Sequence, residues 1–144
     1  MKGTASVILH CEFEELRALT SGLEGTLSEY EGGGVAAPPE VVADIEALLP
    51  RLTGDLSVAS YVEQQSLERA LDFVLDRLRE RMDVAVLSEY VGSERAVLAY
   101  FDYGHVLTIF DRVQSMGEEM FALIELMTGE PPNRDTAGSI TFPD

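Results

Sequence analysis

Asp102 and His105 are the side chains of this 144-residue chain whose types and spacing come nearest to a reactive site. On a helix the two share one face, which is half of the arrangement found in carboxylate-bridged di-iron proteins. The chain has only two histidines, and His10 has no matching acid, so two such pairs cannot form. A mononuclear metal site at Asp102, His105 and Glu119 stays open, as does a small-ligand site at Asp102, Tyr103 and His105 beside Tyr100. The simpler interpretation is a histidine hydrogen-bonded beside tyrosines.

Cys11, the single cysteine, follows His10 directly. It excludes an internal disulfide and a CxxC zinc site. Neighbouring residues on a strand point to opposite faces, so His10 is poorly placed to activate the thiol, and a buried structural cysteine is the better interpretation. No serine lies in a Gly-x-Ser-x-Gly turn, and the glycines of residues 31–38 lack the lysine of a phosphate loop. We therefore predict no catalytic residue, no bound cofactor and no dedicated metal site.

Acidic residues dominate the charge: 26 Asp and Glu against 10 Lys and Arg give a net charge of −16 and a pI near 4.3. Such a surface repels phosphate backbones and anionic lipids, so neither nucleic acid nor a membrane is expected as a partner. The apolar stretches are too short to span a bilayer, and the first residues do not resemble a secretory signal. These features predict a cytoplasmic protein. Strong acidity promotes solubility, and it also suits a basic protein partner.

The first half of the chain alternates between short periodic segments and breaks. Ala5–Phe13 is rich in β-branched residues and predicts a strand, and apolar residues from Phe13 to Tyr30 recur at helical spacing. Residues 31–38, with three consecutive glycines, indicate a flexible linker. Pro39 suits the first turn of a short helix that ends near Pro50. The tail Ser139–Phe142 predicts a second strand, for which the N-terminal strand is the expected partner.

Residues 57–128 contain no proline and few glycines, which indicates two unusually long segments. Ser60 and Glu63 fit a capping box at the start of the first. Apolar residues then recur every three or four positions: Leu67, Leu71, Val74, Leu78, Met82 and Ala85. A second periodic series lines one face from residue 113 onward: Val113, Met116, Met120, Ile124 and Met127. Gly92 and Ser93 could close one helix and open the next, so these segments would form a helical hairpin.

Residues 84–110 also admit a different structure. Val97, Tyr100 and Phe101 favour strands by propensity, and Asp102–Gly104 suits a hairpin loop, so a three-stranded meander is the alternative. A polar stripe at helical spacing runs through Gly104 without a break and favours the helix. We therefore predict a mainly α fold: a helical bundle with a long antiparallel helical hairpin, two shorter helices across it and a small terminal β-ribbon. We expect residues 1–144 to form a single domain.

Composition and pattern favour a small, acidic, non-catalytic interaction or regulatory protein whose partner is a protein, with a basic one as a candidate. The alternatives are a metal- or small-ligand-binding helical protein that uses the face of Asp102 and His105, and a structural subunit of a larger assembly. The long helices should overhang the core of one chain and expose apolar side chains, which predicts a homodimer through residues 95–121. The expected partner-binding residues are Val97, Tyr100, Phe101, Leu107, Phe110, Met116 and Met120. We expected the methionines to serve mainly as core residues, with an adaptable binding groove as the alternative.

Overall fold

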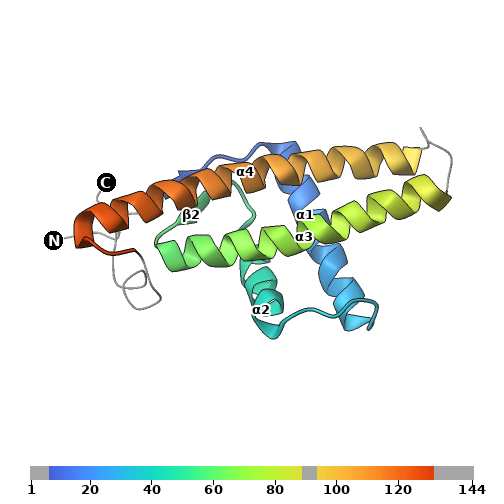
Figure 1. Cartoon of the computed structure of the whole chain (residues 1–144). Helices are drawn as coiled ribbons and strands as arrows, with labels where there is room; N and C mark the ends of the chain where they lie inside the picture. Colours follow the sequence, from blue (N-terminus) through green and yellow to red (C-terminus); the bar gives the residue numbers. More distant parts are fainter. Residues whose placement is uncertain (1–6, 89–93, 132–144) are drawn as a thin grey trace.

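The structure, a computed structural model, describes residues 7–88 and 94–131 (Figure 1). In chain order the elements are β1 (Val7–Leu9), α1 (Phe13–Glu31), α2 (Pro39–Leu48), a 3-10 turn η1 (Leu49–Arg51), β2 (Leu56–Val58), α3 (Tyr61–Ser88) and α4 (Glu94–Thr128). The predicted mainly α fold with a small two-stranded antiparallel sheet is confirmed.

Helices α3 and α4, of 28 and 35 residues, pack against each other and form the predicted antiparallel hairpin (Figure 1). Helix α4 runs without a break through Asp102–Gly104, so the alternative meander is wrong. Val106, Ile109 and Val113 are fully buried on one face of α4, and this burial outweighs the strand propensity of their neighbours. The predicted turn at Gly92 and Ser93 lies outside the described residues.

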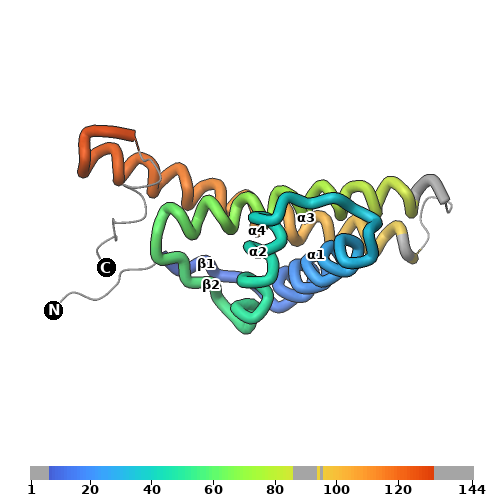
Figure 2. The backbone as a smooth tube through the Cα atoms, turned by 90° about the horizontal axis from the view of Figure 1, so that it is seen from below, coloured from blue at the N-terminus to red at the C-terminus, as the bar shows by residue number. Residues whose placement is uncertain are grey.

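Helix α1 crosses the hairpin and contacts both α3 and α4, while α2 packs against α3 (Figures 1 and 2). Their shared core contains Leu19 and Leu23 of α1 and Ile45 of α2. Gly22 of α1 lies where this helix packs closely on α3. A Cβ at this position would lie 3.0 Å from Cγ1 of Val74, so glycine lets α1 approach α3 closely.

The β-ribbon has a different second strand from the one predicted. β1 pairs antiparallel with β2, with Val7 opposite Val58 and Leu9 opposite Leu56. The proposed partner, Ser139–Phe142, lies outside the described residues. β2 was not predicted, because three residues are too few for a recognisable alternation. The N-terminal strand ends at Leu9, short of the expected Phe13, where α1 begins.

A buried glutamine fixes α3 against α4. Gln64 is completely buried, and its Nε2 donates to the carbonyl of Val113 (2.8 Å) and to Oε1 of Glu68 (2.9 Å). Gly117 faces it on α4, and a Cβ there would lie 2.3 Å from Gln64 Nε2. The amide therefore occupies the space that a side chain at position 117 would need, which defines how the two helices align.

Candidate interaction surface

Arginines form ion pairs with carboxylates of other elements, and these pairs neutralise part of the negative charge. Each of the following pairs joins two elements, or an element and a neighbouring loop: Arg17–Asp102 (3.0 Å), Arg69–Asp44 (2.7 Å), Arg112–Glu15 (2.7 Å), Arg51–Glu63 (3.8 Å), and Arg77 and Arg81 with Glu29. The bases thus serve internal contacts, while the excess of carboxylates remains. With a net charge of −16, the surface is strongly negative.

Glu15 is the buried member of this set, with 4% of the residue exposed. Burial by itself would raise the pKa of its carboxyl group. Hydrogen bonds from Arg112 and from the backbone N–H of Glu12 outweigh burial and hold the pKa below its ordinary value. Arg112 also donates to the carbonyl of His10 (3.0 Å), so one guanidinium joins α4, α1 and the end of β1.

The predicted ligand-binding face is occupied by arginines from other helices. Oδ1 of Asp102 accepts from Nη2 of Arg17, and the hydroxyl of Tyr103 accepts from Nη2 of Arg79 (3.1 Å). The guanidinium of Arg79 also lies 5.9 Å from the centre of the Tyr103 ring, a cation–π distance. His105 is half-buried. Among the described residues no group of three or more His, Cys, Asp or Glu side chains is placed to hold a metal ion.

Cys11 is half-buried, and its Sγ lies 3.8 Å from the carbonyl oxygen of Leu9. Burial, and next the charge of Glu15, raise the pKa of the thiol to about 11. The group therefore stays protonated at neutral pH, which is unsuitable for a nucleophile. His10 turns to Asp55, with Nδ1 2.8 Å from Oδ2.

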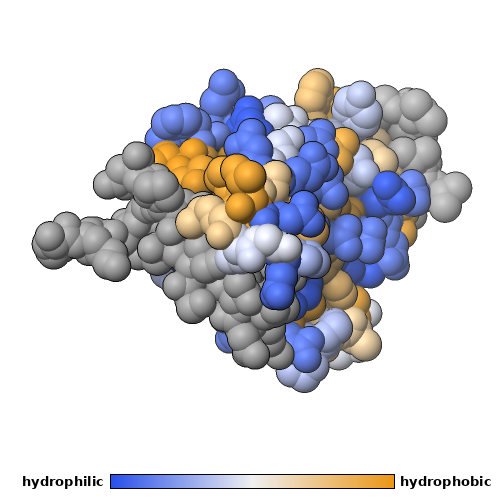
Figure 3. Space-filling model, turned by 60° about the vertical axis from the view of Figure 1, so that its left-hand side comes forward, coloured by the Kyte–Doolittle hydropathy of each residue, from blue (hydrophilic) through white to orange (hydrophobic). Residues whose placement is uncertain are grey.

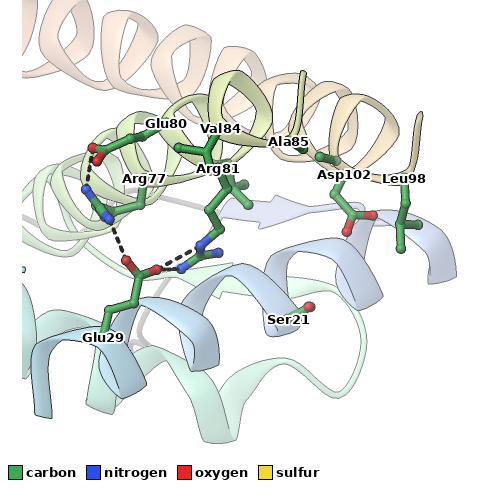
Figure 4. Close-up of a pocket in the computed structure, with 11 residues that line it drawn as sticks. Ser21, Glu29, Arg77, Glu80, Arg81, Val84, Ala85, Leu98 and Asp102 are labelled. Atoms are coloured by element: carbon green, nitrogen blue, oxygen red, sulfur yellow. Dashed lines mark hydrogen bonds and ion pairs between the residues drawn. The ribbon is translucent and has the colours of Figure 1, made fainter. Parts of the chain in front are cut away.

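A cavity of about 380 Å³, absent from the sequence-based predictions, lies between α1, α3 and α4 (Figure 4). Glu29 reaches in from α1 and accepts from both Arg77 and Arg81, and Arg77 also donates to Glu80 (2.5 Å). Nε of Arg77 is buried and has no hydrogen-bond partner. Since both guanidinium groups already face carboxylates, the cavity is best described as an ion-paired joint between α1 and α3.

The outer face of α4, directed away from α3, carries exposed apolar side chains near the beginning of the helix. We define this outer face as Val97, Tyr100, Phe101, Gly104 and Thr108. Its apolar side chains are exposed, Tyr100 at 64%, Phe101 at 55% and Val97 at 41%. The two aromatic rings pack edge to face with centroids 5.8 Å apart. These three residues belong to the predicted partner-binding set, whereas Gly104 and Thr108 do not.

The other predicted partner-binding residues lie deeper. Leu107 and Phe110 are half-buried and pack against the core. Met116 and Met120 are buried at 6% and 1% exposure, as the core interpretation of the methionines requires. Met127, assigned to the same inward face, is instead 56% exposed, because α4 continues there beyond the start of α3 (Figure 1).

Gly104 lies within the outer face, and no contact among the described residues requires a glycine there. A Cβ at this position would have no heavy atom within 4 Å. Glycine within a helix costs about 1 kcal/mol relative to alanine. At Gly22 and Gly117 close internal packing explains the glycine, whereas at Gly104 the described residues leave the space open.

A second apolar area, overlooked by the sequence analysis, lies on the last turns of α4. Leu123, Leu126 and Met127 are 45%, 81% and 56% exposed, with Glu119 and Glu130 near the two ends of the area. Figure 3, which turns this end of the molecule forward, shows hydrophobic surface next to strongly hydrophilic surface. Phe121, 39% exposed, lies beside it and faces Tyr61 of α3.

Comparisons with known proteins give no relative: no family model, no curated protein and no solved structure matches the chain. Within residues 7–88 and 94–131, no helix combines the length and apolar character needed to cross a membrane.

Proposed function

We propose that this chain is a small, acidic, non-catalytic interaction protein that forms a homodimer and binds a basic protein partner. The observation that carries the proposal is the outer face of α4. Val97, Tyr100 and Phe101 present an apolar strip to water on a helix whose opposite side is already packed. Exposed apolar strips of this kind mark interaction sites. A cytoplasmic location remains a prediction.

A second copy of the chain is the occupant that fits the outer face best. The five residues of the outer face carry no charge, although the chain as a whole carries −16. Two copies that met through other exposed surfaces would bring carboxylates together, which costs free energy. Pairing through this neutral strip leaves the acids on the outside and hydrated.

Gly104 supports a close crossing of two α4 helices. It lies between the aromatic pair and Thr108, so small side chains follow one another at a helical spacing of four. Two helices can approach most closely where neither has a Cβ in the way. The open space above Gly104 would then be filled by the α4 helix of the second copy, with Phe101 of each chain packed beside the crossing.

Sedimentation equilibrium at tens of micromolar protein tests the homodimer. The wild type should give twice the chain mass of 15.8 kDa. Phe101→Glu should give a single-chain mass, because it places a charge inside the apolar contact. Phe13→Glu is the control, since Phe13 is 77% exposed at the start of α1 and outside the outer face. A wild type of single-chain mass, or a Phe101→Glu protein that remains dimeric, would refute the homodimer.

The basic partner is argued from charge. The described arginines are engaged in internal pairs, so a cationic protein would meet unneutralised carboxylates over much of the molecule. Association of this kind is steered by long-range attraction and weakens as salt is added. Binding to a basic protein that does not change with ionic strength would contradict this part of the proposal.

A further inference from the structure

A groove of about 360 Å³ lies between the start of α3 and the second half of α4. Tyr61, Gln65 and Glu68 line it from α3, and Gly117, Glu118 and Phe121 line it from α4. Gly117 contributes no side chain to this lining, and the buried amide of Gln64 lies where its Cβ would stand. The side chains that shape the groove therefore come from the other lining residues.

Two aromatic rings form one wall. Tyr61 and Phe121 pack edge to face, with centroids 6.4 Å apart and an interplanar angle of 63°. Phe121 remains 39% exposed, and Tyr61 is half-buried. Ring faces held in place beside a hollow are good surfaces for a planar cation.

Two carboxylates complete the groove, Glu68 and Glu118. Glu68 accepts a hydrogen bond from Gln64, while Glu118 is exposed. Within the described part of the chain, neither of them forms an ion pair. Burial, and next the charge of Glu68, raise the pKa of Tyr61, which places the negative field of this carboxylate at the aromatic wall.

Three other cavities between described residues have a different lining. The cavity beside Glu29 contains Arg77 and Arg81, a second beside Asp44 contains Arg51, and a third beside Glu119 contains Arg112. In each of these the protein supplies its own guanidinium group among the carboxylates. The described residues that line the groove at Tyr61 and Phe121 include carboxylates and aromatic rings but no arginine or lysine.

We infer that this groove binds an arginine side chain of the partner protein. The guanidinium group would stack on the Phe121 and Tyr61 rings and donate hydrogen bonds to the carboxylates of Glu68 and Glu118. The exposed Leu123 and Leu126, which follow on α4, would contact apolar residues beside that arginine. The inference rests on the proposed basic partner and is independent of the homodimer.

A labelled 18-residue helical peptide, with arginines placed beside leucines on one face, serves as the probe. Its binding is measured by fluorescence anisotropy at low ionic strength. Glu118→Gln should weaken binding about tenfold, because a paired charge in the groove is lost. Phe121→Leu, which keeps apolar volume but removes the ring, should weaken it similarly. A lysine version of the peptide should bind less tightly to the wild type, since an ammonium group cannot stack.

Glu24→Gln is the matched control, because it removes the same charge from an exposed position on α1 and should change affinity by less than about twofold. Circular dichroism checks that each variant is folded. Equal weakening by Glu24→Gln and Glu118→Gln would refute arginine binding in the groove, but it would not refute the basic partner. A peptide that does not bind the wild type at all would overturn the basic partner itself.

Discussion

The contact between Gln64 and Gly117 shows how much of this structure depends on single positions. The glutamine is a polar residue without exposed surface, and its amide is satisfied by a backbone carbonyl of the other long helix. A buried polar group of this kind stabilises only the alignment that satisfies it. The sequence offered no sign of it, because glutamine and glycine are both ordinary residues on helix surfaces.

Gly117→Ala should destabilise the fold by about 2 kcal/mol or more, since the new methyl group overlaps the Gln64 amide. Urea unfolding followed by circular dichroism measures the change. Gln64→Ala introduced into the Gly117→Ala protein should recover part of the loss, because it removes the clash. A Gly117→Ala protein as stable as the wild type would show that α3 and α4 are not aligned as described.

The lowered pKa of Glu15 predicts that the stability of the fold depends on pH. The carboxylate contributes its full stability above its pKa in the unfolded chain, about 4.3. This contribution is lost as the pH falls through the lower pKa of the folded protein. Glu15→Gln should therefore be less stable than the wild type at neutral pH, and the difference should shrink below about pH 4. Urea unfolding at several pH values measures this. With Glu24→Gln as the exposed control, a constant difference across the pH range would contradict the prediction.

Among the secondary-structure elements, α4 best shows how the prediction from sequence compares with the structure. Local propensity at Val97, Tyr100 and Phe101 favours strands, and only the burial of Val106, Ile109 and Val113 against α3 explains why the segment is helical. Periodicity located α1, α2 and α3 correctly because each has a clear apolar face. β2 and the exposed apolar area on the last turns of α4 could not be predicted, since they depend on where distant segments meet and where they stop.

Gly104→Ala distinguishes the stability of the α4 helix from the affinity of the homodimer through its outer face. The methyl group meets nothing inside the chain, so in the monomeric Phe101→Glu background it should raise the free energy of unfolding by up to about 1 kcal/mol. In the otherwise wild-type protein the same change should weaken the homodimer, because it obstructs the crossing. Thermal unfolding and sedimentation measure the two effects, and a tighter dimer would argue against a crossing at Gly104.

At the scale of the whole molecule, shape and charge act together. α4 is about 52 Å long by its residue count, and the hairpin extends past α1 while α4 extends past the start of α3 (Figures 1 and 2). Exposed apolar side chains lie near both ends of α4, and the chain carries a net charge of −16. The proposed homodimer and the proposed basic partner would use these two ends separately.

The net negative charge predicts that the protein does not bind nucleic acids. With a charge of −16, it should show no affinity for DNA or RNA at physiological salt, because phosphates would be repelled. Passage over a nucleic-acid column at rising salt measures this. Retention at low salt that disappears at high salt would reveal a basic surface that the described residues do not provide.

The distance between two copies at the outer face is the most direct test of the central claim, that α4 pairs with itself. A nitroxide label on Asp111→Cys, an exposed position of α4 just outside the outer face, with Cys11→Ser to remove the native thiol, reports it by pulsed electron resonance. Helices packed about 8–10 Å apart should bring two such labels within about 35 Å of each other. The same label on Glu46→Cys, on α2, should give a longer distance. No intermolecular coupling at position 111, or a shorter distance at position 46, would contradict pairing through this face.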